Sequence, residues 1–151
     1  MSEIIQLKSH GEISLSTKSE WGKNNNTEIV WAGVSNQGVK IVDKLTNSLT
    51  TTDFNLNPVA RIEFNFELYP EHAAEDHLGN VYIYSQSYSS IFILENSSTR
   101  LRMHIDLNKL RILSTSVKSM STNDAGQLGV LGYEGNFFEF SKNGLKKFSH
   151  K

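Results

Sequence analysis

The segment richest in side chains that could do chemistry is Glu71-His72-Ala73-Ala74-Glu75-Asp76-His77. Imidazole and carboxylate groups can hold zinc. On a helix, His72 and Asp76 would share one face, but His72 and His77 are five residues apart and diverge by roughly 140°. Zinc enzymes use two histidines four residues apart, so the spacing is wrong. We therefore expect no metal, and interpret the segment as an exposed acidic cap in which Asp76 closes a turn.

Other routes to catalysis find no support in the sequence. The chain has no cysteine, which excludes disulfides, thiolate metal sites and a cysteine nucleophile. No serine lies in a Gly-x-Ser-x-Gly motif, and the glycines at 129 and 132 lack the helix and lysine of a phosphate-binding loop. Glu63 and Glu67 lie on one face of a predicted strand but roughly 13 Å apart. We expect no catalytic residue, no cofactor and no enzymatic activity.

Aromatic and acidic side chains near strand ends are the better candidates for function. Tyrosine at a turn tip is common at binding surfaces because it offers a large contact area with few torsions to fix. Neighbouring carboxylates would attract a basic partner. The predicted partner-binding residues are Tyr69, Glu71, Glu75, Asp76, Tyr88, Tyr133 and Glu134. The alternative is an ordinary surface with scattered tyrosines.

Three segments that could position these residues repeat along the chain: 27–43, 79–95 and 126–142. Ile29, Val81 and Leu128 are equivalent, at offsets of 52 and then 47 residues, and apolar residues recur at alternate positions. Because successive strand residues point to opposite faces, this recurrence predicts one hairpin formed three times. The second segment is apolar on its outer positions too, so we expect it to be covered on both faces.

Short strands fill most of the remaining chain. Residues 61–68 alternate apolar and polar side chains, which is typical of a half-buried strand. Asn143-Gly144 is a tight-turn dipeptide between two closing strands. The only helix candidate is residues 70–77, where proline, alanine and glutamate favour a first helical turn. The sequence thus predicts a single all-β domain over residues 1–151 with at most one short helix.

The repeated hairpins resemble the blades of β-propellers. Ile29 to Val39, with Trp31 and Gly33, resembles the strand-turn-strand core of sensor-type regulator propellers. Asp76-His77-Leu78-Gly79-Asn80-Val81-Tyr82 is similar to the start of an NHL-like blade, and residues 123–126 repeat it, whereas the first repeat has Asn26-Thr27 there. The resemblance implies a propeller-like fold but no functional residue.

A β-sandwich or rolled meander of similar hairpins fits the residues as well. Propellers usually have at least four blades. Three blades would therefore be open or irregular, completed by the N-terminal strands, or completed by a second copy in a homodimeric ring.

Net charge and the lengths of the apolar runs argue against nucleic acid and membranes as binding partners. The formal net charge is −1, which does not favour nucleic acid, and no apolar run is long enough to span a membrane. The start, Met1-Ser2-Glu3, does not resemble an export signal, so a cytoplasmic protein is expected.

Three function hypotheses follow. The first is a non-catalytic protein-binding module, in its sharpest form a small bacterial immunity protein that neutralises a cognate toxin by occupying a basic cleft. The alternative is a propeller- or lectin-like protein that binds a small ligand or glycan at hairpin mouths lined by Trp21, Trp31 and Tyr88. An enzyme with dispersed catalytic residues ranks third.

Overall fold

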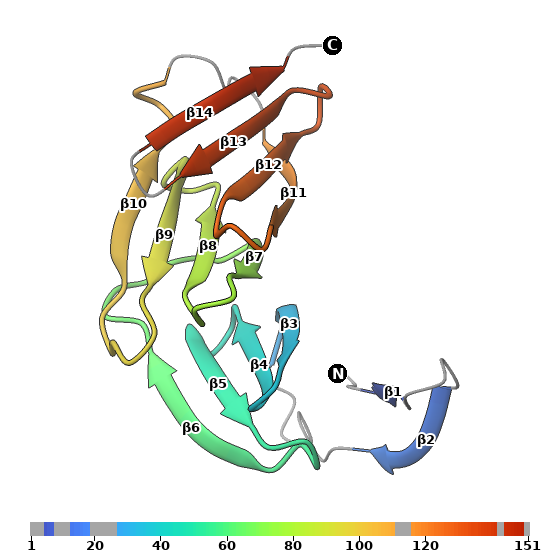
Figure 1. Ribbon diagram of the computed structural model, residues 1–151. Helices are drawn as coiled ribbons and strands as arrows, with labels where there is room; N and C mark the ends of the chain where they lie inside the picture. The colour runs from blue at the N-terminus through green and yellow to red at the C-terminus, as the bar shows by residue number, and fades with distance from the viewer. Residues whose placement is uncertain (1–4, 8–12, 19–26, 111–115, 142–143, 150–151) are drawn as a thin grey trace. The chain divides into compact units, whose positions relative to one another are not determined.

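All regular structure in the described part of the chain is β-strand (Figure 1). The computed structural model describes residues 5–7, 13–18, 27–110, 116–141 and 144–149. Within them, the strands form one two-stranded and three four-stranded sheets, all antiparallel between neighbours. The all-β class and the propeller-like repetition are confirmed. None of the described residues belongs to a helix long and apolar enough to cross a membrane.

The chain divides into two compact units, residues 1–63 and 64–151, and each is described by itself. In the first unit, β1 (Ile5–Leu7) pairs with β2 (Ile13–Lys18). Its four-stranded sheet contains, in order, β3 (Ile29–Ser35), β4 (Gly38–Asp43), β5 (Ser48–Thr52) and β6 (Pro58–Glu63). A small apolar cluster of Val39, Ile41 and Leu56 lies in this unit. A single domain over residues 1–151 stays a prediction.

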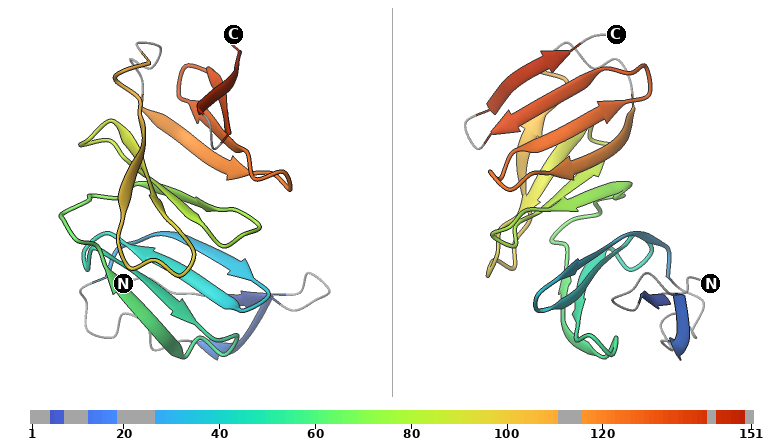
Figure 2. Two further views of the ribbon diagram at one scale, coloured as in Figure 1. Left: turned by 60° about the vertical axis from the view of Figure 1, so that its left-hand side comes forward. Right: turned by 45° about the vertical axis from the view of Figure 1, so that its right-hand side comes forward.

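The second unit contains two four-stranded sheets (Figure 2). The first is made of β7 (His72–Glu75), β8 (Val81–Ser85), β9 (Ser90–Leu94) and β10 (Arg102–Asp106). The other is made of β11 (Val117–Thr122), β12 (Leu128–Gly132), β13 (Phe137–Ser141) and β14 (Gly144–Ser149). The sequence also predicts a strand over residues 110–114, most of which lie outside the described residues.

A tight turn links the second and third strands of each four-stranded sheet, over residues 44–47, 86–89 and, beginning at the last residue of β12, 132–135. Asn47, Ser89 and Gly135 end this turn with φ angles of 49°, 47° and 84°, and each donates its backbone N–H to the carbonyl three residues earlier. The recurring hairpins are therefore β4–β5, β8–β9 and β12–β13. The sequence superposition placed the first hairpin one strand too early, at residues 27–43, because alternating apolar residues look alike in any pair of neighbouring strands.

A five-residue loop also recurs, between β5 and β6, β7 and β8, and β11 and β12. Its first residue is Asp53, Asp76 or Asn123, whose side-chain oxygen accepts hydrogen bonds from the backbone N–H groups two and four residues later. Its fourth residue has a positive φ and is Leu56, Gly79 or Gly126. Sequence comparison found the second and third loops but missed the first, because Leu56 stands where the others have glycine.

The predicted helix at residues 70–77 is wrong. His72 to Glu75 form β7, which pairs with β8 along its whole length. Ala73 and Ala74 are both buried there. Ladder hydrogen bonds and burial on both faces outweigh helix propensities, which differ by less than about 1 kcal/mol per residue. Residues 61–68 also depart from expectation, since the strand β6 ends at Glu63.

The core of the second unit lies between its two sheets. One sheet contributes Ala74, Tyr82, Tyr84, Ile91, Ile93 and Ile105, and the other contributes Val117, Leu128, Val130, Phe138 and Phe140. Every residue of β8 and β9 is buried, so the second hairpin is covered on both faces, as expected. In contrast, β12 alternates between buried and half-buried residues, so only one of its faces belongs to this core.

Asp76 ties the turn between β7 and β8 to the core. It is 7% exposed, and its carboxylate accepts hydrogen bonds from the backbone of Leu78 and Asn80, from the Asn80 amide and from the Tyr82 hydroxyl. Each buried donor that loses its partner costs about 1–3 kcal/mol. We predict that Asp76→Ala lowers the free energy of unfolding in urea by about 2–4 kcal/mol.

Asp53→Ala is the matched control, because Asp53 opens the equivalent loop between β5 and β6 and is half-buried there. Hydrogen bonds from Asn57 hold the pKa of Asp53 below its usual value. The free energy of unfolding should fall clearly less in Asp53→Ala than in Asp76→Ala. Equal losses for the two variants would contradict the anchoring role of Asp76.

The Tyr82 hydroxyl predicts an alkaline limit to stability. Burial, together with the nearby Asp76 carboxylate, raises the pKa of Tyr82 to about 12. Because folding raises this pKa, the protonated Tyr82 hydroxyl contributes fully to the free energy of unfolding below pH 10, the ordinary tyrosine pKa. That contribution is lost as the pH rises through about 12. Tyr82→Phe should show a shallower fall in unfolding free energy over this range in urea titrations. Identical pH profiles for the two proteins would contradict the prediction.

Candidate functional site

Five of the seven predicted binding residues lie at one rim of the second unit. The rim is defined by the start of β7, the end of β8 and the turns that follow β8 and β12. The Glu71 N–H donates to the Tyr84 carbonyl at 2.9 Å, which places Glu71 beside the end of β8. Tyr88 and Tyr133 lie in the turns after β8 and β12. We call Tyr69, Glu71, Tyr88, Tyr133 and Glu134 the tyrosine rim.

Both sheets contribute to the same rim because β7 and β11 run side by side in the same direction. At the ends of these strands, the Thr122 hydroxyl donates to the Glu75 carbonyl. At their starts, the Val117 backbone hydrogen-bonds to Tyr84, the residue paired with His72. The turns after β8 and β12 therefore lie at one end of the unit.

The three tyrosines are presented in different ways. Tyr88 is 42% exposed, yet its hydroxyl donates to the Glu67 carbonyl at 3.0 Å and its ring packs edge-on against Phe66 and Phe92. Tyr69 is 47% exposed and is held at a φ of 51°. Tyr133 is 65% exposed at the tip of its turn. Tyr88 is thus a fixed platform, and Tyr133 is the most accessible ring.

The charge at the tyrosine rim is mainly negative. Glu71 is half-buried and Glu134 is exposed. The sequence prediction missed two further carboxylates at this end of the unit. The Glu67 carbonyl accepts the hydrogen bond from Tyr88, and Asp106, at the end of β10, is paired with Ser90, just after the turn that carries Tyr88. Among the described residues, Lys109 follows the end of β10 and Lys118 lies near the start of β11, at the same end of the unit as the rim. The four carboxylates Glu67, Glu71, Asp106 and Glu134 outnumber these two lysines.

Glu75 and Asp76 lie at the opposite end of β7, away from the tyrosine rim. Asp76 is buried and holds its loop, while the Glu75 side chain is half-buried. The sequence alone could not separate them from Glu71, because the direction of β7 decides which end each residue occupies.

His72 and His77 are also separated by β7. The His72 ring stacks on Tyr84 with 6.2 Å between centroids, whereas His77 lies near Gly126 at the opposite end. Across the described ranges, no three His, Cys, Asp or Glu residues gather as a metal site would require.

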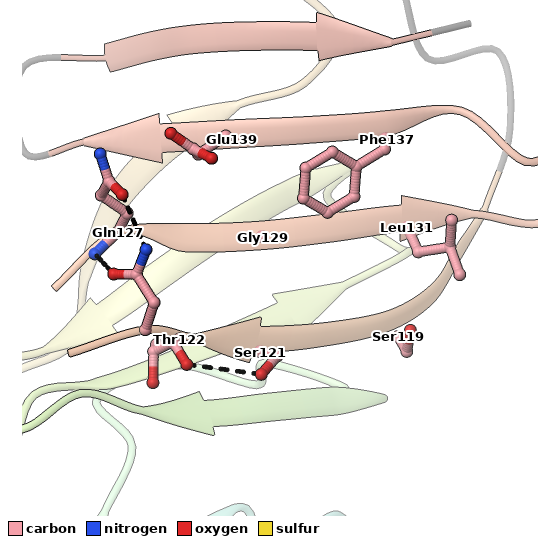
Figure 3. Close-up of a pocket in the computed structure, with 9 residues that line it drawn as sticks. Ser119, Ser121, Thr122, Gln127, Gly129, Leu131, Phe137 and Glu139 are labelled. Carbon is pink, nitrogen blue, oxygen red and sulfur yellow. Dashed lines mark hydrogen bonds between the residues drawn. The ribbon is translucent and has the colours of Figure 1, made fainter. Parts of the chain in front are cut away.

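A hollow of about 330 Å³ lies on the face of β11, β12 and β13 that points away from the core (Figure 3). Its floor is made of two cross-strand rows, Ser119–Leu131–Phe137 and Ser121–Gly129–Glu139. The loop between β11 and β12 closes one end. We call it the Phe137 hollow, lined by Ser119, Ser121, Thr122, Asn123, Gln127, Gly129, Leu131, Phe137 and Glu139.

Gly129 shapes this hollow. A Cβ atom at this position would lie 3.2 Å from ring atoms of Phe137, so the ring lies close over the glycine. A glycine inside a strand often marks such a close approach. That was the available sequence signal, but it does not identify which side chain approaches.

No protein-family model matches the chain. No curated protein matches its sequence. Among solved structures, a streptogramin B lyase is similar with a TM-score of 0.68 and 13% identity, over 97% of this chain and 46% of the lyase chain. A luciferin-regenerating enzyme is similar with a TM-score of 0.71 and 13% identity, over 98% of this chain and 56% of the other. YCF48 bound to a D1 peptide is similar with a TM-score of 0.55 and 13% identity, over 77% of this chain and 37% of the YCF48 chain.

These similarities show a propeller-like fold, in agreement with the blade resemblance. The chain spans about half the length of the lyase and of the luciferin-regenerating enzyme. The expectation that the chain is not an enzyme is corrected, because enzymes are among the proteins that share its fold.

Proposed function

We propose that the chain is a protein-binding propeller-like module and that its tyrosine rim binds a basic surface of a partner protein. The observation that carries the proposal is the joint placement of Tyr88 and Tyr133 with Glu71 and Glu134 at one end of two packed sheets. Aromatic anchors on a rigid frame lose little conformational freedom on binding. YCF48, a structural neighbour, is itself described with a bound peptide, which adds support at the level of the fold.

The charge at the rim sets the class of partner. Carboxylates that outnumber the neighbouring lysines speed association with a basic surface and discriminate against an acidic one. Such a surface fits the basic cleft of a nuclease toxin, so the finer form of the proposal is a bacterial immunity protein acting in the cytoplasm. In that form the partner loses its nuclease activity when bound.

The experiment begins with the tagged full chain, purified from its native host together with any protein that co-elutes. The co-eluting protein is identified by mass, purified, and titrated against the chain and its variants by calorimetry. We predict that Tyr133→Ala weakens this binding at least tenfold, as is typical of a hot-spot residue. Leu78→Ala is the control, since Leu78 is similarly exposed, at the opposite end of β7. Equal affinities for the two variants, or no co-eluting protein, would argue against the rim.

Charge reversal tests the electrostatic part separately. We predict that Glu134→Lys slows association and flattens its dependence on salt, because long-range attraction is screened over about 8–10 Å at physiological ionic strength. Asp124→Lys is the control, as it reverses an exposed charge in the loop at the other end of the sheet. Association rates that respond alike to both reversals would remove the argument for a basic partner. Nuclease activity of the co-purified protein, with and without the chain, tests the immunity form.

A further inference from the structure

We propose that the Phe137 hollow binds a neutral sugar, at a site distinct from the tyrosine rim. The inference rests on three features of the second unit: the outward face of β11, β12 and β13, an aromatic ring on that face, and uncharged polar groups with one carboxylate among the described residues around it.

The pattern of the strands indicates that this face is open to water. In β8 and β9, which are covered on both sides, every residue is buried. In β12 and β13 the outward positions are instead Gly129, Leu131, Phe137 and Glu139, which are half-buried or exposed. A strand packed under a further sheet reads as a continuous apolar run, whereas alternation is typical of one solvated face. The outward face of β12 and β13 therefore suits a ligand better than another blade.

The aromatic ring gives the hollow an apolar platform. Phe137 is 36% exposed, and its ring lies against Gly129, where no side chain competes for the space. Leu131 is paired with Phe137 across the strands and extends the platform along the sheet. A pyranose ring has an apolar C–H face that can lie on such a surface, while its hydroxyls point sideways.

Polar groups surround that platform. Glu139 belongs to the neighbouring row and is the one ionisable residue among the described side chains that line the hollow; in the register of the sheet its partner on β14 is Lys147. Its carboxylate can accept hydrogen bonds from hydroxyl groups, and it disfavours an acidic ligand. Figure 3 shows the Gln127 side chain extending toward β13, the strand of Glu139.

The Gln127 amide is held in place by its neighbour. The Asn123 amide donates to the Gln127 oxygen at 2.7 Å, which orients the Gln127 nitrogen as a donor. With the hydroxyls of Ser119 and Ser121, the described lining of the hollow offers hydrogen-bond donors and acceptors and contains no positively charged side chain. Its volume of about 330 Å³ lies at the lower end for small-ligand sites, which suits a mono- or disaccharide.

Saturation-transfer NMR on the full chain tests this proposal. The probes are glucose, galactose, N-acetylglucosamine and their β-linked disaccharides, each at roughly 10 mM, with glucuronic acid as the charged comparison. We expect transfer to at least one neutral sugar and none to glucuronic acid. No transfer to any neutral sugar, or stronger transfer to glucuronic acid, would overturn the proposal.

Variants locate the binding. Phe137→Ala should weaken it at least tenfold, and Glu139→Gln should weaken it less. Phe54→Ala removes an exposed phenylalanine from the first unit and should leave it unchanged. Gly129→Ala should also weaken sugar binding, because the added Cβ would displace the Phe137 ring. Sugar binding that survives both Phe137→Ala and Gly129→Ala would place the site elsewhere. Thermal unfolding of each variant confirms that it is folded.

Discussion

The structure of the second unit depends on the packing of two β-sheets through one shared apolar core. Tyr82, Tyr84, Ile91 and Ile93 on one sheet meet Leu128, Val130, Phe138 and Phe140 on the other. Burial of a large aliphatic or aromatic side chain contributes about 1.5–3 kcal/mol, so these contacts dominate the stability of the unit. Because they also fix β7 beside β11, they decide which turns lie at the same end. The tyrosine rim is a consequence of that interface, whereas the Phe137 hollow lies on the opposite face of β11, β12 and β13.

The two surfaces differ in what makes them rigid. At the tyrosine rim, Tyr88 is fixed by its hydroxyl bond to the Glu67 carbonyl and by ring contacts with Phe66 and Phe92. In the hollow, Phe137 is fixed by its approach to Gly129. The rim presents edges and charge to a large partner, whereas the hollow offers a flat ring with hydrogen-bonding groups around it. These are different kinds of recognition: the rim uses the turn between β12 and β13, and the hollow uses the outward face of the strands that the turn connects.

The sequence predicted features that depend on local chemistry. Asp76 and Gly79 identify a loop because the carboxylate caps nearby N–H groups and the glycine takes a positive φ. Features that depend on distant partners were missed. Residues 72–75 have the composition of a helix, but pairing with β8 makes them a strand. That single change moves Glu75 and Asp76 away from Glu71. Likewise, Gly129 acquires its role only when Phe137 on the next strand lies over it.

The most direct measurement of the central claim is hydrogen–deuterium exchange of the full chain with and without its co-purified partner. The account predicts slower exchange on binding at the turns 86–89 and 132–135, which carry Tyr88 and Tyr133. The loops 76–80 and 123–127, at the other end of the same sheets, should exchange equally fast in both states. Protection confined to those loops, with the turns unchanged, would contradict the assignment of the tyrosine rim as the binding surface.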